Sequence, residues 1–471
     1  MRFNNIGTMK KILSGIRPEY FALLVLVAFQ TYLITSSDGF YYIDEGAHFM
    51  DDFSALRNPS VSIGVWQRFG SVWMFTLPAQ LGPIGVKVFA SLLFLLSIYV
   101  AYKVAELEQL PYREWLVVLV GFQPVLLDIS FTCLAELPAT LFLILAYYLF
   151  RKSWWRLSLS TASLVFLFRY EMSILAVILF VIALRQRKYS ALPFALLGPA
   201  LWFLFSWFWT GDPSWLFREF VKFGSLPKFI EGTGWFHYLK HSADIFGTYQ
   251  VWLLVLSLLL ALYRRKLRFA VPLLTILWCV FFNTLASAKA FNWTPSVGDF
   301  RYLATVAPFV GLLSLDGLSQ AMEFLRNVPL SKFIPSVLAL LIAYNTLPAV
   351  HPHHITPYEN AVVALTRRAA ADSTTIPILS NHWASRFALM NSRIELDRIE
   401  GLTKKNYLQN PSEYIVWDSQ IANSIFSQQA LSFGDVQKDP TVRLVDSLNV
   451  YGGSVFLFRK EAAIDKVSKS K

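Results

Sequence analysis

Four carboxylates and one histidine gather directly after the first long apolar run of the chain. They lie within residues 40–52 and are Asp44, Glu45, His48, Asp51 and Asp52. Asp44 and His48 are four residues apart, so they share one face if the segment is helical. A positioned carboxylate can take a proton from a substrate hydroxyl, whereas acids just outside a membrane can also be plain solvated residues. The stretch therefore predicts either a catalytic carboxylate or a solvated loop.

Further ionisable residues stand where apolar runs begin or end. Asp128 ends one run and Glu136 begins the next, and Arg169 and Glu171 separate two runs by a tight turn at the membrane edge. Three more candidates around the 287–301 loop are Lys289, Arg301 and Tyr302. Ionisable groups at such depths are costly and usually face a bundle interior or a cavity. They indicate either structural Arg–Glu pairs or charges arranged around one substrate cavity.

The composition requires a membrane around these residues. Of 471 residues, 55% are hydrophobic and 15% are charged, with a mean hydropathy of +0.46, which excludes an ordinary soluble protein. The net charge of +11 comes from short Lys/Arg clusters between apolar runs, which favours membrane topology over nucleic-acid binding. Cys133 and Cys279 lie in or beside apolar runs and fit small core residues. We expect no disulfide framework, no metal site and no cofactor, although a divalent ion remains compatible with the sequence.

Apolar runs of spanning length predict a polytopic helical domain over residues 1–349. They lie near 20–35, 84–102, 114–131, 134–150, 157–168, 172–184, 191–209, 248–263, 269–286, 302–318 and 333–349, about eleven spans. Alternate connections carry basic clusters, such as Arg151 with Lys152 and Arg264 with Arg265. By the positive-inside rule the N-terminus is cytoplasmic, and an odd number of spans places the C-terminus outside.

This orientation gathers the conspicuous polar loops on the non-cytoplasmic face. They are the first external loop at 36–83, the connection at 128–136, the loop at 210–247 and the loop at 287–301. In the 210–247 loop, aromatic residues alternate with charged ones from Trp215 to Phe223. This pattern predicts a helix lying along the bilayer surface, as a simple surface helix or as a loop that gates substrate entry.

The composition changes at about residue 350, and residues 350–471 predict a small soluble α/β domain outside the membrane. Glu359 to Ala371 has the pattern of an amphipathic helix. Short strands are expected at 376–379, 414–417, 443–445 and 455–458. The cluster of His351, His353 and His354 can bind a metal or form a linker turn, and the linker turn is favoured.

Residues 18–349 resemble the GT-C superfamily of membrane glycosyltransferases. Within it they are most similar to the branch that holds the protein O-mannosyltransferases and the lipid A aminoarabinose transferases. Four matches carry the resemblance: Asp44-Glu45 in the first external loop, Glu136 at the external start of the fourth span, the amphipathic loop at 210–247, and the Arg-Tyr-Leu-x-x-x-x-Pro element at 301–308. Each motif is short. The match rests on their order along the chain and on their common position on the non-cytoplasmic side of the membrane.

The resemblance implies an inverting transfer of a sugar from a polyprenyl- or dolichyl-phosphate donor to an acceptor hydroxyl. It implies Asp44 as the base, with Glu45 or His48 orienting it. Candidates for the lipid phosphate are Arg301, Arg169 and Lys289. The remaining substrate-binding candidates are Asp128, Glu136, Glu171 and Tyr302. The acceptor, a glycan, lipid or protein, stays open.

Two other functions fit parts of the sequence. A lipid or glycolipid transporter needs acids near the bilayer midplane and internal repeats, but here the acids cluster in a loop and no repeat is evident. A scaffold without activity, whose outer domain binds a partner, is the second. The scarcity of cysteine and the absence of a retrieval signal favour a bacterial inner membrane over the endoplasmic reticulum.

Overall fold

The computed structural model describes residues 17–225, 235–265, 267–287, 299–372, 375–390, 398–409, 413–419, 431–451 and 453–461. The chain divides into two compact units. Unit 1 consists of Met1–Ser37, Asp51–Ser225 and Ile230–Pro352, and unit 2 of Asp38–Met50, Leu226–Phe229 and His353–Lys471. The sequence-based boundary at 349/350 assigned residues 38–50 to the transmembrane part, whereas their contacts group them with the C-terminal residues.

Unit 1 is helical throughout its described part. Its α-helices are α2 (Pro18–Ser36), α4 (Phe69–Ala79), α5 (Gly82–Leu107), α6 (Leu116–Gly121), α7 (Pro124–Asp128), α8 (Glu136–Arg151), α9 (Trp155–Leu164), α10 (Ile174–Arg185), α11 (Leu197–Thr210), α12 (Trp215–Ser225), α13 (His237–Lys240), α14 (Ser242–Phe246), α15 (Thr248–Tyr263), α16 (Ala270–Ser287), α17 (Ala307–Phe324) and α18 (Ile334–Thr346). Its 3₁₀ helices are η1 (Pro59–Ser62), η2 (Arg113–Trp115), η3 (Val165–Leu167), η4 (Tyr170–Ser173), η5 (Tyr189–Leu196), η6 (Phe300–Val306), η7 (Ser331–Phe333) and η8 (Leu347–Ala349). Helix α3 (Tyr42–Ser54) begins in unit 2 and ends in unit 1.

Five described segments are long and apolar enough to cross a membrane. They are Pro18–Ser36, Gly82–Leu107, Tyr189–Thr210, Phe300–Phe324 and Ser331–Ala349. Shorter apolar helices cover Thr248–Tyr263 and Ala270–Leu285. The mostly helical, membrane-spanning fold is as predicted, and the number of about eleven spans stays a prediction.

The run predicted as one span at 114–131 is divided into shorter helices in the structure. Helix α6 ends at Gly121, and α7 begins at Pro124. Gln123, before the proline, has an extended backbone with ψ of 125°. Proline has no N–H to continue the helix and pushes the preceding residue out of the helical region, so the break follows from the sequence. Hydropathy alone does not report it.

Helix α17 lies at the centre of unit 1. In the window around Phe300–Phe324, 89% of residues are buried, against 17% for the window around α18. Helix α17 packs closely against α15, where a Cβ added at Gly317 would lie 2.1 Å from the Leu253 carbonyl oxygen. Small residues at helix crossings allow such backbone approach in membrane proteins. The contact fixes the helix whose N-terminal extension carries Arg301.

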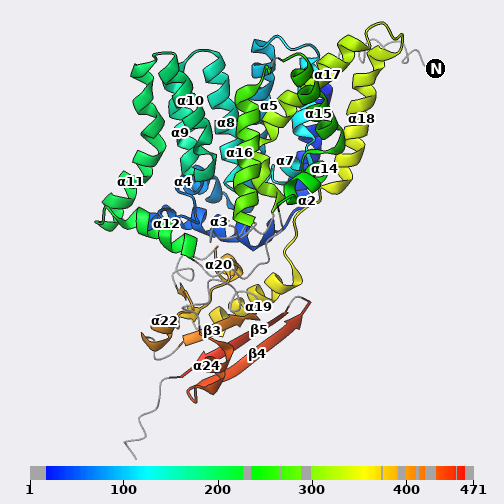
Figure 1. Ribbon diagram of the computed structural model, residues 1–471. Helices are drawn as coiled ribbons and strands as arrows, with labels where there is room; N and C mark the ends of the chain where they lie inside the picture. The colour runs from blue at the N-terminus through cyan, green and yellow to red at the C-terminus, as the bar shows by residue number, and fades with distance from the viewer. Residues whose placement is uncertain are drawn as a thin grey trace, which may run out of the picture. The chain divides into compact units, whose positions relative to one another are not determined.

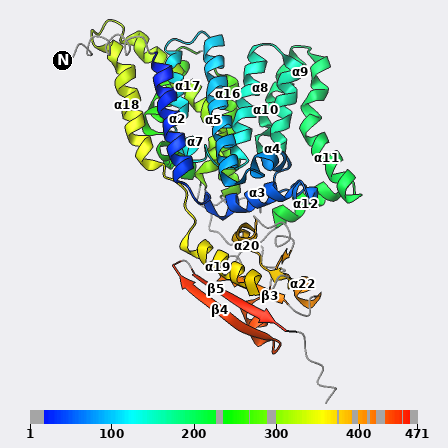
Figure 2. The same ribbon diagram turned by 180° about the vertical axis from the view of Figure 1, so that it is seen from behind.

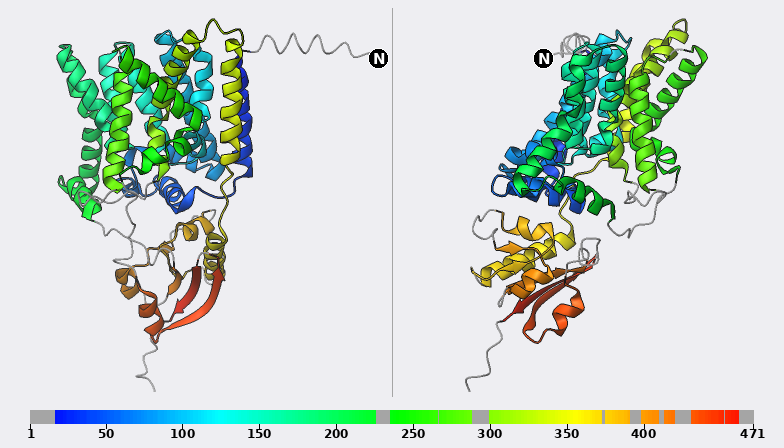
Figure 3. Two further views of the ribbon diagram at one scale, coloured as in Figure 1. Left: turned by 45° about the vertical axis from the view of Figure 1, so that its right-hand side comes forward. Right: turned by 60° about the vertical axis from the view of Figure 1, so that its left-hand side comes forward.

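The other helices surround this centre in sequence-adjacent groups. Helix α9 packs against α8 and α10, which lie side by side in Figure 1. Helices α2 and α18 run next to each other along one edge of the unit (Figures 2 and 3). The loop predicted to hold a surface helix contains α12, which carries Trp215 and Phe217 beside Arg218.

Unit 2 contains a five-stranded mixed sheet in the order β2-β1-β3-β5-β4. Its strands are β1 (Ile378–Leu379), β2 (Ile399–Glu400), β3 (Glu413–Asp418), β4 (Val442–Val450) and β5 (Gly453–Lys460). Strand β1 is parallel to β2 and β3, whereas β5 is antiparallel to β3 and β4. Each of the four predicted strand segments overlaps a strand of this sheet.

Helices cover both faces of the sheet. Besides the start of α3, the described part of this unit contains the helices α19 (Pro357–Asp372), α20 (Trp383–Ala388), α22 (Lys404–Gln409) and α24 (Phe433–Lys438). Trp417 and Phe458 pack with Val436 of α24 on one face. On the other face, Tyr358 of α19 donates a hydrogen bond to Asp418, and Figure 1 shows α19 lying along the sheet. Successive side chains of β3 therefore pack into two cores, one on each face of the sheet, as expected for a strand covered on both sides.

The residues before and within the first half of α3 pack onto α20 inside unit 2. The Gly39 N–H donates to the His353 carbonyl at 2.9 Å. Phe40 stacks edge-on against Trp383, with ring centroids 5.0 Å apart. A Cβ at Gly46 would lie 2.4 Å from the Trp383 ring. Asp44, Glu45 and His48 therefore lie in a helix that packs within unit 2 rather than in a free loop.

We expect Gly317→Ala to destabilise unit 1. The added Cβ meets backbone rather than a movable side chain, so α15 and α17 must separate, at a cost of about 1–3 kcal/mol. The thermal unfolding midpoint of the purified chain in detergent measures this. Gly434→Ala is the matched control, because the nearest atom to its Cβ is 3.9 Å away. Equal midpoints for the two variants would contradict the close α15–α17 contact.

We also expect unit 2 to lose stability as the pH falls. Burial lowers the pKa of His382 to about 4, and its Nδ1 accepts the Ala384 N–H at the start of α20. Between roughly pH 6.5 and pH 4 the unfolded chain binds a proton that the folded chain excludes, so unfolding becomes easier by up to roughly 3 kcal/mol.

His382→Asn tests this, because asparagine keeps an oxygen that caps the helix but does not titrate. Unfolding midpoints of the full chain at pH 7.5 and pH 4.5 should differ less in the variant than in the parent. An identical pH dependence would show that His382 is protonated without penalty in the folded state.

Candidate active site

A buried ion-pair cluster joins three distant parts of unit 1. Glu136 opens α8, Arg169 precedes η4, and Arg301 lies in η6, and all three side chains are buried. Glu136 Oε1 lies 2.5 Å from Arg169 Nη1 and 3.7 Å from Arg301 Nε. The two arginines therefore share one carboxylate oxygen. Each of the three positions was a candidate from the sequence, and the structure brings them together.

Two further carboxylates complete the cluster. Glu171 pairs with Arg169, and its backbone carbonyl accepts the Trp278 indole N–H at 2.8 Å. Asp299 lies 2.8 Å from Arg301 Nε and also accepts the Arg301 backbone N–H at 3.0 Å. The turn that contains Arg301 is thus fixed by its own N-cap residue.

Tyr302 lies against both arginines of the cluster. Its ring centroid is 4.4 Å from Arg169 Cζ and 5.4 Å from Arg301 Cζ. Cations at these distances from an aromatic ring are attracted by its electron-rich face. The structure therefore brings Glu136, Arg169, Glu171, Arg301 and Tyr302 together as a set of ion pairs and ring contacts, and their role in substrate binding stays a prediction.

Sequence reasoning missed Arg68, which lies beside this cluster. Its Cζ is 4.5 Å from the Tyr170 ring centroid, and its charge acts on Glu171. Arg68 has a left-handed backbone with φ of 61°, which is strained for a residue with a side chain. Its Nη1 is buried and makes no hydrogen bond within the described part of the chain. Helix α4 follows Arg68, its N-cap residue, and is only 11 residues long, too short for a hydropathy scan to separate it from the loop.

Lys87 is a second buried cation that the sequence analysis passed over. It lies inside the apolar helix α5, only 2% exposed, and its Nζ donates to the Ser37 carbonyl at 2.9 Å. Ser37 follows the last residue of α2. A lysine that donates to a carbonyl at a helix end stabilises that end. The sequence did carry a signal for Lys87, because a single lysine within a long apolar run is unusual.

Asp44, Glu45 and His48 of the acidic stretch lie in the first half of α3, in unit 2, whereas Asp51 and Asp52 lie in its second half, in unit 1. Asp44 and His48 share one helix face, as their spacing predicted, with Asp44 half-buried and His48 buried. Glu45 is fully buried, and its carboxylate accepts the Tyr41 backbone N–H at the start of the helix. Glu45 therefore fixes the beginning of α3, whereas Asp44 is the more accessible carboxylate.

The remaining candidates have separate positions. Asp128 is half-buried at the end of α7. Lys289 lies outside the described residues. His354 pairs with Asp38 at 2.8 Å, and this hydrogen bond holds the pKa of Asp38 below its usual value. No group of three metal-binding side chains is present among the residues that the structure describes. His354 thus contacts the segment before α3, and the linker-turn interpretation of the histidine cluster stays a prediction.

Comparison with known proteins gives a fold and no sequence family. No family model matches the chain, and no curated protein matches it. Two crystal structures of ArnT from Cupriavidus metallidurans do match. The apo state aligns with a TM-score of 0.59 at 10% identity, covering 93% of this chain and 97% of that chain. The state bound to undecaprenyl phosphate aligns with a TM-score of 0.56 at 10% identity, covering 94% and 98%.

ArnT is a lipid A aminoarabinose transferase with the GT-C fold. The likeness spans nearly the full length of both chains, although the sequences have diverged to 10% identity. The resemblance that four short motifs suggested is therefore confirmed at the level of the fold: this chain has an ArnT-like, GT-C-like fold.

Proposed function

We propose that the protein is a glycosyltransferase that moves a sugar from a polyprenyl-phosphate donor to an acceptor hydroxyl on the non-cytoplasmic face of a membrane. The observation that carries the proposal is the pairing of an ArnT-like fold with a buried arginine–carboxylate cluster at span ends. One of the two ArnT structures is bound to undecaprenyl phosphate, which supports the class of donor. The acceptor is a glycan, a lipid or a protein.

The proposed reaction is a single displacement with inversion. The acceptor oxygen bonds to the anomeric carbon as the bond from that carbon to the phosphate oxygen breaks. The acceptor proton passes to a carboxylate, and the lipid phosphate leaves with the bonding electrons. Asp44 is the proposed base, because it is the less buried member of the Asp44-Glu45 pair. Glu45 positions it by fixing the start of α3 through Tyr41.

Fixed positive charge is needed where the phosphate leaves. Arg301 is the residue proposed to bind the phosphate, and Arg169 adds a second positive charge. Tyr302 contacts both guanidinium groups and holds them in place. Arg68 joins this set, because its buried Nη1 has no hydrogen-bond acceptor in the described residues. Lys289 remains a candidate. No step requires a metal ion or a cofactor.

The proposed topology keeps the N-terminus in the cytoplasm and the C-terminus outside, with about eleven spans in a bacterial inner membrane. Glu136 and Arg169 then lie at the external ends of their helices, where a flipped lipid-linked sugar arrives. The basic ends of α8 and α10 lie at the cytoplasmic side, at Arg151 and Arg185.

The first test of the function is turnover by the purified chain supplied with radiolabelled polyprenyl-phosphate sugars. We expect Asp44→Asn to fold and to bind donor, and to lose about 10²–10⁴-fold in turnover, because the amide keeps the shape of the side chain but cannot accept the proton. Donor binding is measured separately by retention of labelled lipid on the protein.

Two further variants serve as controls for the Asp44→Asn measurement. Asp38→Asn removes an exposed carboxylate from the same segment and should leave turnover near that of the parent. Glu45→Gln should lower thermal stability more than turnover, since it weakens the bond to Tyr41. Near-normal turnover in both Asp44→Asn and Glu45→Gln would show that this stretch takes no part in the reaction. If Glu45→Gln has no turnover and Asp44→Asn is active, Glu45 is the base and Asp44 the positioning residue.

We expect Arg301→Ala to weaken donor use by at least tenfold and Arg301→Lys to recover only part of it. Lysine keeps the charge but lacks the two-pronged guanidinium that matches a phosphate. The measurement is kcat/KM for the lipid donor at saturating acceptor. Arg218→Ala, an exposed arginine on α12, is the matched control.

Removal of Arg301 also leaves Glu136 and Asp299 with less positive charge, so a stability measurement must accompany the kinetics. Arg301→Ala with a lower unfolding midpoint and unchanged donor kcat/KM would make the residue purely structural. A rise in donor KM at an unchanged midpoint supports the phosphate role.

A further inference from the structure

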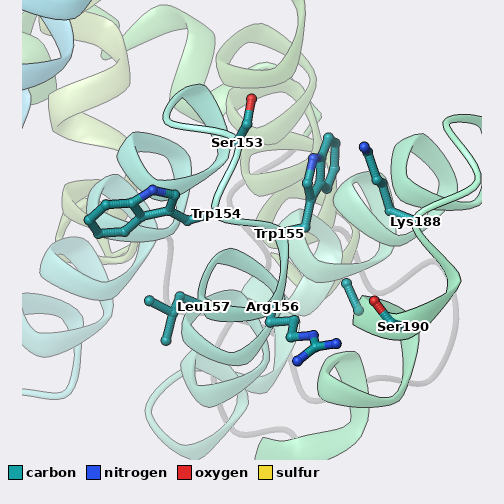
Figure 4. Close-up of a pocket in the computed structure, with 8 residues that line it drawn as sticks. Ser153, Trp154, Trp155, Arg156, Leu157, Lys188 and Ser190 are labelled. Atoms are coloured by element: carbon teal, nitrogen blue, oxygen red, sulfur yellow. The ribbon is translucent and has the colours of Figure 1, made fainter.

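A hollow of about 290 Å³ opens at the end of unit 1 opposite the ion-pair cluster. It lies between the turn that joins α8 to α9 and the turn that joins α10 to η5. Two cations, two indoles and two hydroxyls line it, and Figure 4 shows them together: Arg156, Lys188, Trp154, Trp155, Ser153 and Ser190. The Arg156 side chain extends toward Ser190 in this view. The proposed function uses none of these residues.

The two cations of the hollow make no ion pair with any residue that the structure describes. Two other basic residues near helix ends at this side of unit 1 are paired, Arg151 with Glu108 at 2.8 Å and Lys103 with Glu106 at 2.8 Å. Two like charges in one hollow repel each other unless an anion lies between them. The lining therefore favours a ligand with negative charge and hydrogen-bond acceptors.

The margin of the hollow is apolar and exposed. Trp154 is 55% exposed, Leu157 54% and Tyr189 59%. Tryptophan and tyrosine favour the level of lipid headgroups, where one side of the ring is wet and the other meets acyl chains. A ligand whose phosphate fills the hollow can continue as an acyl chain along Leu157, which a free phosphate ion cannot do.

We propose that this hollow binds the phosphate-bearing headgroup of an anionic membrane lipid. Arg156 and Lys188 supply the charge, Ser153 and Ser190 donate hydrogen bonds, and Trp154 and Leu157 contact the upper part of the acyl chains. Basic pockets between spans bind anionic headgroups by the same combination. A volume near 290 Å³ suits a headgroup and not a whole lipid.

This lipid is distinct from the proposed donor. Helix α8 runs from Glu136, in the ion-pair cluster, to Arg151, next to the hollow, which is roughly 24 Å of helix. The two sites therefore lie at opposite ends of the α8–α9 hairpin. Loss of lipid binding at the hollow and loss of sugar transfer at the cluster are separately measurable.

The test is native mass spectrometry of the full chain in detergent, titrated with phosphatidylglycerol and, in parallel, with zwitterionic phosphatidylcholine. The double variant Arg156→Ala with Lys188→Ala should bind phosphatidylglycerol about 10- to 30-fold more weakly than the parent. The exchange variant Arg156→Lys with Lys188→Arg keeps both charges and should retain most of the binding. Unfolding midpoints verify that each variant is folded.

The matched control is Arg185→Ala with Arg187→Ala, which removes the same charge from the same end outside the hollow. The proposal requires that this control keeps phosphatidylglycerol binding and that phosphatidylcholine binds weakly to all variants. An equal loss in the control would assign the effect to the general surface charge and overturn the proposal. Displacement of phosphatidylglycerol by equimolar inorganic phosphate would assign the hollow to a soluble anion and overturn it as well.

Discussion

The ion pair between Glu136 and Arg169 is the constraint on which the membrane unit depends. Isolated charges at the depth of span ends are costly, so each must find a partner within the fold. Glu136 meets Arg169 from the next hairpin and Arg301 from a segment far along the chain. Breaking such a buried pair costs about 3–5 kcal/mol, because it leaves an uncompensated charge. The same pairs therefore hold the α8 and η4 region against the extension of α17 and set the position of the arginines proposed to bind phosphate.

The position of α17 follows from this constraint together with close packing. Arg301 leads into α17, the most buried of the long apolar helices, and Gly317 allows α15 to approach it at backbone distance. Tyr302 then lies between the arginines and the start of the helix. A small residue inside the helix and a charged cluster before its start act together, since Gly317 sets how closely α15 approaches and the ion pairs hold the N-terminal extension.

The sequence predicted most of the residues that form the site, but it did not predict how they pair. Glu136, Arg169, Glu171 and Arg301 were identifiable because each is an ionisable residue at the edge of an apolar run. Their pairing was not, because it depends on contacts between segments up to 165 positions apart (136 to 301).

Arg68 and α4 were not predicted, since an 11-residue apolar helix is shorter than a span. The first half of α3 was predicted as part of an external loop, and the contact of its Gly46 with Trp383 has no local sequence signal. The expected strands of the second unit were found because alternation and turn residues are local.

The balance of charge in the cluster bears on how a phosphate would bind there. Arg68, Arg169 and Arg301 face Glu136, Glu171 and Asp299, so the set is close to neutral before any ligand arrives. An incoming phosphate must therefore compete with carboxylates for the guanidinium groups rather than fill a preformed positive hole. Arg169, held by two carboxylates and Tyr302, is the least able to turn toward a ligand. Arg68 differs, because its backbone is strained and its buried Nη1 has no hydrogen-bond acceptor among the described residues. Strain of this kind persists where the surrounding structure enforces it, often at ligand sites. Under the proposed function, a lipid phosphate therefore accepts hydrogen bonds from Arg68, which the sequence did not reveal, as well as from Arg301.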